Sequence, residues 1–194
     1  MYGTTEYGGA NRYGTVFKIT PSGALTKLYS FCSQSGCADG ANPFGPLVQA
    51  TDGNLYGTTQ IGGANTSGCG GQGCGTVFKI TPSGTLTTLY SFCSQSGCPD
   101  GANPYSRLVQ ATDGNFYGTT VSGGAFTYCG FAGGCGTVFK ITPSGSLTTL
   151  HSFDGGDGAG PLGLVQATGG NFYGTTSSGG GPTPATAGRS SACR

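Results

Sequence analysis

The chain has 194 residues, of which 35% are hydrophobic and only 8% are charged, and its formal net charge is +1. This near-neutral balance excludes the broad basic surface of a nucleic-acid-binding protein, and no apolar run is long enough to span a membrane as a helix. The 41 glycines alternate with apolar segments, which indicates many tight turns between short strands.

One ten-residue stretch, GTVFKITPSG, occurs three times without change. It spans residues 14–23, 75–84 and 136–145, so successive copies start 61 residues apart. The matching sequence extends well beyond these ten residues. The pattern therefore indicates a supersecondary unit that is repeated along the chain.

Each full unit contains four segments with the features of short β-strands. In the second unit they cover residues 47–51, 55–59, 76–81 and 86–92. Aromatic and β-branched residues, together with the DGN and PSG turns, favour an antiparallel meander over helices. We name the four strands a, b, c and d, and four such strands are typical of a propeller blade.

The units follow one another in a simple order, with 13 predicted strands in total. We predict repeats over residues 1–180, with a partial blade (b, c, d) at 1–31, full blades at 47–92 and 108–153, and closing strands a and b at 164–176. Residues 181–194 lack the pattern and are predicted to form a disordered tail.

Three blades are too few to close a ring, since propellers typically have four to eight. We therefore predict an all-β protein, a β-propeller of four-stranded antiparallel blades with about three blades per chain and a six-bladed ring completed by homodimerisation. Strand a at the end of one chain would complete the b-c-d blade that begins the other. Either of the two terminal b strands could then fill the shared blade.

Nine cysteines are a large number for a reducing compartment, and eight of them fall into close pairs. We predict that each pair bridges its own loop, contributing at most about 2 to 3 kcal/mol because the loops are short. The predicted bridges are Cys32–Cys37, Cys69–Cys74, Cys93–Cys98 and Cys129–Cys135. Cys193 is left over, and zinc binding by reduced pairs is the alternative.

All of the cysteine pairs and all of the length changes fall in the b-to-c and d-to-a loops. In a meander blade these loops lie on one face, whereas the tight a-to-b and c-to-d turns lie on the other. Variable loops on a rigid scaffold are where binding sites are usually built. We expect any functional site on the loop face, near the axis.

The d-to-a loops carry four of the seven acidic residues of the chain and lead into the innermost strands. Asp and Asn oxygens arranged in a ring suit a divalent cation, above all calcium. The predicted ligands are Asp39, Asn42, Asp100, Asn103 and Asp157, with Asp154 nearby in the same loop as Asp157. The alternative is structural, because DGANP is also a good turn sequence.

Aromatic residues in the same loops could stack on a sugar or an apolar ligand. The predicted contacts are Tyr13, Phe126 and Tyr128, and Tyr7 and Phe131 have the same loop character. Alternatively, these rings simply cover the ends of the blades. His151, the only histidine, replaces Tyr29 and Tyr90 of the other units and is interpreted as a packing residue rather than a general base.

The consensus LVQATDGNxYGTTxxGG…GTVFKITPSGxLTTLYSF…DGANP is similar to the GloVer-type (Gloeo/Verruco) tandem repeat of bacterial extracellular proteins. This resemblance implies an exported or cell-surface protein with a propeller-like fold, and it brings no catalytic residues with it. The DGNxY and FKITPSG segments also resemble the blades of NHL and gluconolactonase-like propellers. Some of those bind calcium at the axis and hydrolyse lactones or phosphotriesters.

The chain departs from the family pattern at its ends. Met1 stands where Leu55, Phe116 and Phe172 stand in the other units, and the sequence shows neither an export signal nor an anchor. We expect a truncated piece of a longer extracellular or cell-surface protein.

Two functions fit these observations. The first is a metal-assisted hydrolase of esters, lactones or phosphotriesters, in which the axial cation acts as Lewis acid or activates water. The second is a non-catalytic module that binds glycans or small ligands. No Ser-His-Asp arrangement is readable in the sequence, so no catalytic residue is predicted.

Overall fold

A computed structural model describes residues 1–66, 68–129 and 133–181 of the chain. This part contains 13 β-strands and one short 3-10 helix, and it has no α-helix. No helix in the described residues is long and apolar enough to cross a bilayer. The predicted tail, with Cys193, lies outside the described residues apart from Gly181.

The strands form four antiparallel sheets, each with its strands in chain order. The first sheet contains β1 (Tyr2–Thr5), β2 (Thr15–Ile19) and β3 (Leu25–Ser30), and the 3-10 helix Ser35–Cys37 follows it. The second contains β4 (Val48–Gln49), β5 (Leu55–Thr59), β6 (Thr76–Ile80) and β7 (Leu86–Ser91). The third contains β8 (Val109–Gln110), β9 (Phe116–Thr120), β10 (Thr137–Ile141) and β11 (Leu147–Ser152). The fourth contains β12 (Ala159–Gln166) and β13 (Phe172–Ser178).

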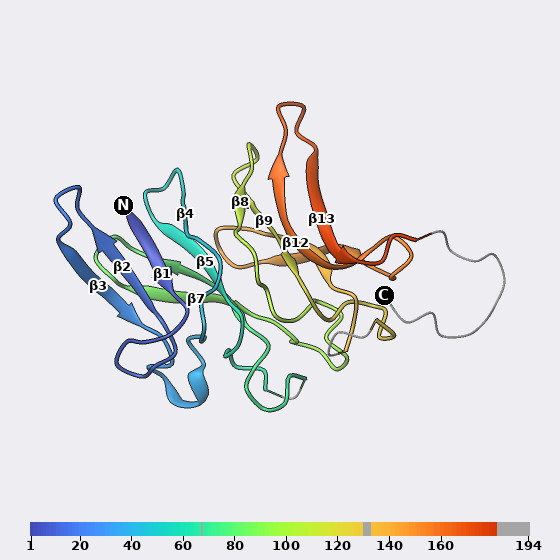
Figure 1. Cartoon of the computed structure of the whole chain (residues 1–194), viewed down its shortest axis with the longest axis horizontal. Helices are drawn as coiled ribbons and strands as arrows, with labels where there is room; N and C mark the ends of the chain where they lie inside the picture. Colours follow the sequence, from blue (N-terminus) through green and yellow to red (C-terminus); the bar gives the residue numbers. More distant parts are fainter. Residues whose placement is uncertain (67, 130–132, 182–194) are drawn as a thin grey trace.

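The sheets therefore hold three, four, four and two strands, which is the grouping that the repeats predict. They lie side by side in a row that does not close into a ring within the described residues (Figure 1). Strand a is shorter than predicted in the inner units, with two residues in β4 and in β8. The reason is the a-to-b turn, which already begins at Ala50, where the amide donates to the Asn54 carbonyl at 2.9 Å.

A glycine in strand b faces a phenylalanine in strand c of the same unit. Gly57 is paired with Phe78, and a Cβ on Gly57 would lie 2.7 Å from the Phe78 ring. Gly118 and Phe139 repeat the arrangement at the same distance. The large ring of strand c fills the space that the missing side chain of strand b leaves.

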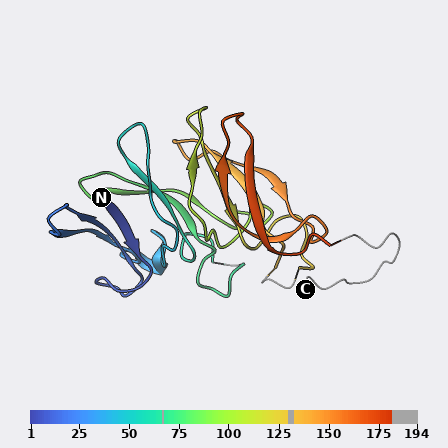
Figure 2. The same ribbon diagram turned by 45° about the horizontal axis from the view of Figure 1, so that its top comes forward.

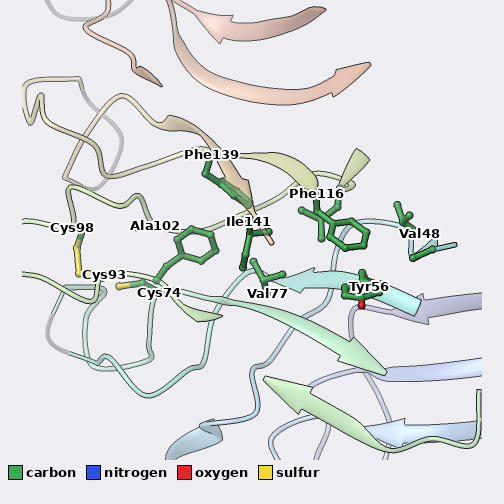
Figure 3. Packing of buried hydrophobic residues seen from close by; sticks show 13 residues of the cluster. Val48, Tyr56, Cys74, Val77, Cys93, Cys98, Ala102, Phe116, Phe139 and Ile141 are labelled. Carbon is green, nitrogen blue, oxygen red and sulfur yellow. A yellow bond between two sulfur atoms is a disulfide. The ribbon is translucent and has the colours of Figure 1, made fainter. Parts of the chain in front are cut away.

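Rings also join each unit to the next. Phe31 at the end of the first unit meets Phe78 edge-on with centroids 5.1 Å apart, and Phe92 meets Phe139 in the same way at 5.2 Å. Tyr56 stacks on Phe116 of the following unit with a centroid distance of 4.1 Å. Figure 3 shows Tyr56, Phe116 and Phe139 within one cluster of buried residues. The core thus lies within the sheets and between them.

The molecule has two unlike faces. The tips of the β4–β5, β8–β9 and β12–β13 hairpins lie on the upper side in Figure 1, and the long loops lie on the lower side. Figure 2 shows the same separation after rotation. The two kinds of long loop touch each other, since the amide of Gly63 donates to the carbonyl of Cys37 at 2.9 Å. The loop face is therefore a continuous surface made of both kinds of loop.

Candidate binding surface on the loop face

The four predicted disulfides are formed. Cys32 is bonded to Cys37, Cys69 to Cys74, Cys93 to Cys98, and Cys129 to Cys135. Each bridge lies on the loop face and joins two cysteines with only four or five residues between them. The bridges therefore fix the shape of the surface on which a site was expected.

Asp39, a predicted cation ligand, is fully buried in a network within its own loop. Its Oδ2 accepts hydrogen bonds from the Tyr29 hydroxyl at 2.8 Å and from the Ser33 amide and hydroxyl, both at 2.9 Å. Its Oδ1 accepts from the Gln34 amide at 3.2 Å. The carboxylate thus has a complete set of donors without a cation.

Asp100 repeats this network one unit later. Its Oδ2 accepts from the Tyr90 hydroxyl at 2.7 Å and from the Ser94 amide and hydroxyl at 3.0 and 2.9 Å. Its buried Oδ1 has no partner among the described residues. Burial, opposed by the Ser94 hydrogen bond and reinforced by Asp100, raises the pKa of Tyr90 to about 12, so the phenol is a donor at neutral pH.

Asn42 and Asn103, the predicted amide ligands, also serve the loops. Both have a left-handed backbone with φ of 54°, a conformation that asparagine tolerates better than most residues. Their Nδ2 atoms donate to the Glu6 carbonyl at 3.2 Å and to the Gln60 carbonyl at 3.1 Å. Each asparagine therefore ties a d-to-a loop to a neighbouring b-to-c loop.

Asp157, the last predicted ligand, bonds to His151 at 2.6 Å through its Oδ2 and accepts the Asp154 amide at 2.9 Å through Oδ1. Although partial burial opposes it, the hydrogen bonds from Asp154 and His151 hold the pKa of Asp157 below its ordinary value. The predicted packing role of His151 is seen in its edge-on contact with the Phe153 ring, but the His151 side chain is 51% exposed. The histidine also forms an accessible pair with a carboxylate.

The predicted oxygen ligands are not gathered around one point. In the described ranges, no three carboxylate groups lie within 4.8 Å of one another, and the acids of each loop bond within that loop. The residues present therefore do not fit a shared axial cation, and calcium binding stays a prediction. The sequence feature that pointed to a structural role for these acids and asparagines is the DGANP segment, which is a good turn sequence.

The backbone segments that begin strands a do converge. A Cβ on Gly45 would lie 2.9 Å from the carbonyl carbon of Ser106, and one on Gly163 would lie 3.2 Å from the Ser106 Cβ. The Thr58 hydroxyl of β5 donates to the Ser106 carbonyl at 3.2 Å, which ties the second unit to the third at this point. The two d-to-a loops that lead into β4 and β8 therefore meet strand β12 at this point.

Two aromatic rings lie at this meeting point, one residue before Gly45 and one before Ser106. Phe44 and Tyr105 pack against each other with centroids 3.8 Å apart and planes inclined by 30°. Phe44 remains 45% exposed, and Tyr105 is half-buried. We call Phe44 and Tyr105, with the neighbouring Tyr7, the aromatic platform.

Tyr7 is 67% exposed and comes from the loop between β1 and β2. A hydrogen bond to the Glu6 carboxylate raises the pKa of Tyr7, and the charge of Glu6 and the nearby Tyr105 phenol add to the effect. The platform thus combines rings from three loops with a carboxylate beside them. Only Tyr7 among these residues was singled out from the sequence.

The sequence profile of the Gloeobacter/Verrucomicrobia repeat matches residues 1–187, which is nearly the whole chain. The chain belongs to this repeat family. No curated protein matches the sequence. A solved structure that carries a provisional gluconolactonase assignment is 16% identical, with a TM-score of 0.48. The alignment covers 85% of this chain and 50% of that protein, so the chain spans about half its length.

Of the predicted ligand-binding rings of this repeat protein, two lie in a different loop from the platform, whereas Tyr13 shares the β1–β2 loop with Tyr7. Phe126 and Tyr128, in the loop between β9 and β10, are 38% and 56% exposed and pair with each other at 6.0 Å. Tyr13, in the β1–β2 loop, is 41% exposed. Phe131 lies outside the described residues.

One sequence signal could have located the platform of this repeat. Phe44 and Tyr105 occupy the same place in two successive repeats, directly after the proline of DGANP. Leu162, which follows Pro161 in the next unit, is also exposed, at 54%. A large apolar residue kept at an exposed turn is an unusual use of such a side chain.

Proposed function

We propose that the chain is an extracellular, non-catalytic module that binds a glycan or another ring-shaped small ligand on its loop face. The observation that carries the proposal is the Phe44–Tyr105 ring pair, which is partly exposed and lies where two d-to-a loops meet strand β12. The four disulfides support an oxidising, extracellular setting, because such bridges are typical of that environment.

The chemistry of the platform suits a sugar. Aromatic faces pack against the C–H faces of a pyranose ring, and a carboxylate such as that of Glu6 accepts hydrogen bonds from hydroxyl groups. The rings would lose little conformational entropy on binding, because Gly45 is packed tightly against the Ser106 backbone. A preorganised, partly apolar surface with one polar group supports recognition without requiring a reaction.

The test is calorimetric titration of the full chain with soluble hexasaccharides: cellohexaose, maltohexaose and chitohexaose. We expect saturable binding to at least one of them. Phe44→Ala and Tyr105→Ala should each lower the affinity about tenfold, because each removes one stacking face. The matched control is the double variant Phe126→Ala and Tyr128→Ala, which removes another exposed ring pair elsewhere on the loop face.

Two results would count against this assignment. One is the absence of binding to all three sugars at millimolar concentration. The other is binding that survives both platform variants and disappears in the Phe126/Tyr128 control, which would move the site to the loop between β9 and β10.

Metal-assisted hydrolysis of esters, lactones or phosphotriesters is the second candidate. The observation in its favour is the exposed His151–Asp157 pair, because a carboxylate that orients an imidazole is a common arrangement for a general base. If the pair is catalytic, His151→Gln should abolish turnover of a lactone or an aryl ester while leaving the fold intact. A cation requirement is checked separately by chelation, and turnover that withstands both treatments would remove this candidate.

A further inference from the structure

Two of the four disulfides meet in the second unit. The sulfur atoms of Cys74, Cys93 and Cys98 lie within 4.8 Å of one another, and Cys69 is bonded to Cys74. Within the described residues this is the only place where three or more His, Cys, Asp or Glu ligand atoms lie so close together. Figure 3 shows Cys74, Cys93 and Cys98 side by side at one end of the buried cluster. We call the four residues the sulfur cluster.

The repeat register explains why the sulfur cluster occurs once. The first unit has a bridge after its strand d, Cys32–Cys37, but its b-to-c loop contains no cysteine. The third unit has Cys129–Cys135 in its b-to-c loop, but DGGDG follows its strand d. Only the second unit carries both pairs. The first and third units therefore provide two incomplete sites within the same chain.

We propose that the sulfur cluster binds one zinc ion when its two disulfides are reduced. Zinc prefers four thiolates at about 2.3 Å in a tetrahedron, which places the sulfur atoms about 3.8 Å apart. Three of the four sulfur atoms, those of Cys74, Cys93 and Cys98, already lie within 4.8 Å of one another. Reduction frees Cys69 from Cys74 and Cys93 from Cys98, so each pair can open to the spacing that the ion requires. Both pairs have four residues between their cysteines, within the usual zinc spacing, whereas Cys129 and Cys135 have five.

Binding is coupled to reduction, because a disulfide sulfur is not a thiolate ligand. An external dithiol supplies two electrons and two protons to each bridge and is itself oxidised to a disulfide, so two dithiol molecules release four thiols. Zinc then displaces four thiol protons, which pass to the solvent. The oxidised chain holds no ion at this place, and the reduced chain holds one.

The surroundings permit access. A pocket of about 180 Å³ lies beside Cys98, and glycines supply much of its lining: Gly68, Gly97, Gly123 and Gly133. A Cβ on Gly68 would collide with the sulfur atoms of Cys93 and Cys98. The glycine therefore lets the backbone approach the sulfur cluster, and it offers a variant that alters the site without removing a ligand.

The experiment uses the full chain with Cys193→Ser, reduced with a dithiol, desalted without oxygen and titrated with Co²⁺ as a spectroscopic substitute for zinc. We expect one equivalent of Co²⁺ to give the thiolate charge-transfer and tetrahedral d–d bands, and Zn²⁺ to remove them. Replacing the four cysteines of the two isolated pairs by serine should leave the titration unchanged. Cys74→Ser should abolish the tetrathiolate spectrum, and Gly68→Ala should weaken binding at least tenfold.

The circular dichroism spectrum is recorded in parallel to show whether the reduced chain keeps its strands. The proposal is overturned if the reduced chain gives no thiolate bands, or if the bands survive Cys74→Ser. It is also overturned if the bands depend on the isolated pairs, or if reduction removes the strand spectrum and neither metal restores it. Bands in the unreduced chain would contradict the coupling to reduction.

Discussion

Buried carboxylates hold the loop face together at the level of single residues. Asp39 and Asp100 sit in matching networks of a tyrosine, a serine and a backbone amide, so the loops that seemed suited to a cation are closed by their own donors. The sequence shows both the acid and the turn. It does not show which way the carboxylate points, because that depends on the tyrosine of the preceding strand.

Asp39→Ala should lower the free energy of unfolding by about 2 to 4 kcal/mol, because the four donors from Tyr29, Ser33 and Gln34 would lose their buried acceptor. Asp100→Ala serves as the matched variant in the next unit. Urea unfolding followed by circular dichroism, in calcium and in a chelator, measures both. The losses should be equal in the two buffers; a loss that appears only with calcium would mark Asp39 as a cation ligand.

The a-to-b turns carry a pH dependence. Hydrogen bonds from Asn115 and Tyr117 lower the pKa of Asp113, and at Asp52 those from Asn54 and Tyr56 outweigh the opposing effect of burial and lower its pKa too. A carboxyl group whose pKa is lower in the folded chain stabilises it above its unfolded pKa of about 3.9, and this contribution disappears as the pH falls through the folded pKa.

The double variant Asp52→Asn and Asp113→Asn should therefore be less stable than the parent chain at pH 6. The gap should close as the pH falls through the lowered pKa values of the two carboxyl groups, because both then become protonated in the parent chain. Urea midpoints measured from pH 2 to pH 7 give the difference directly. A gap that stays constant across this range would show that the turns act through shape rather than charge.

At the level of the strands, the glycine of strand b leaves almost no room for a side chain. Gly57→Ala should cost about 1 to 3 kcal/mol, because the added methyl group would lie 2.7 Å from the Phe78 ring and the core cannot absorb it without shifting. Gly169→Ala is the control, since a Cβ there meets nothing within 4 Å. Chemical denaturation should separate the two variants; equal stability would mean that the ring moves aside freely.

The elements also show what the sequence can and cannot reveal. Strands β5, β6 and β7 follow from turn chemistry and a repeated pattern, both of which are local. The aromatic platform does not follow from local sequence. Phe44 and Tyr105 are separated by one 61-residue period, and they meet only because two loops pack together at Gly45 and Ser106. Side-chain direction in a loop is decided by its neighbours, and these are distant in sequence.

At the scale of the whole molecule, the last sheet exposes a face whose equivalent in the second unit is covered by the following unit. Tyr56 is 1% exposed because it stacks on the next unit, whereas the equivalent Tyr173 is 59% exposed, and Val165 beside it is 62% exposed. A surface of this kind is suited to another copy of the first unit. The six-bladed ring of two chains remains our proposal for how that face is covered.

Light scattering coupled to size-exclusion chromatography tests the six-bladed ring of two chains. We expect twice the mass of one chain, and Tyr173→Arg should shift the mass to that of a monomer because the charge cannot be buried against an aromatic partner. Tyr128→Arg, at an exposed ring in the β9–β10 loop, is the control and should leave the dimer intact. A monomer mass for the parent chain at high concentration would remove the two-chain ring.

The stacking of Tyr56 on Phe116 is repeated by Tyr117 on Phe172 at 4.2 Å, and in both cases the tyrosine contacts the ring at the start of strand b in the following unit. The joint between the first and second units differs, because Leu55 stands there in place of the ring. Insertion or removal of one whole 61-residue segment between these units would recreate this contact with no compensating change elsewhere.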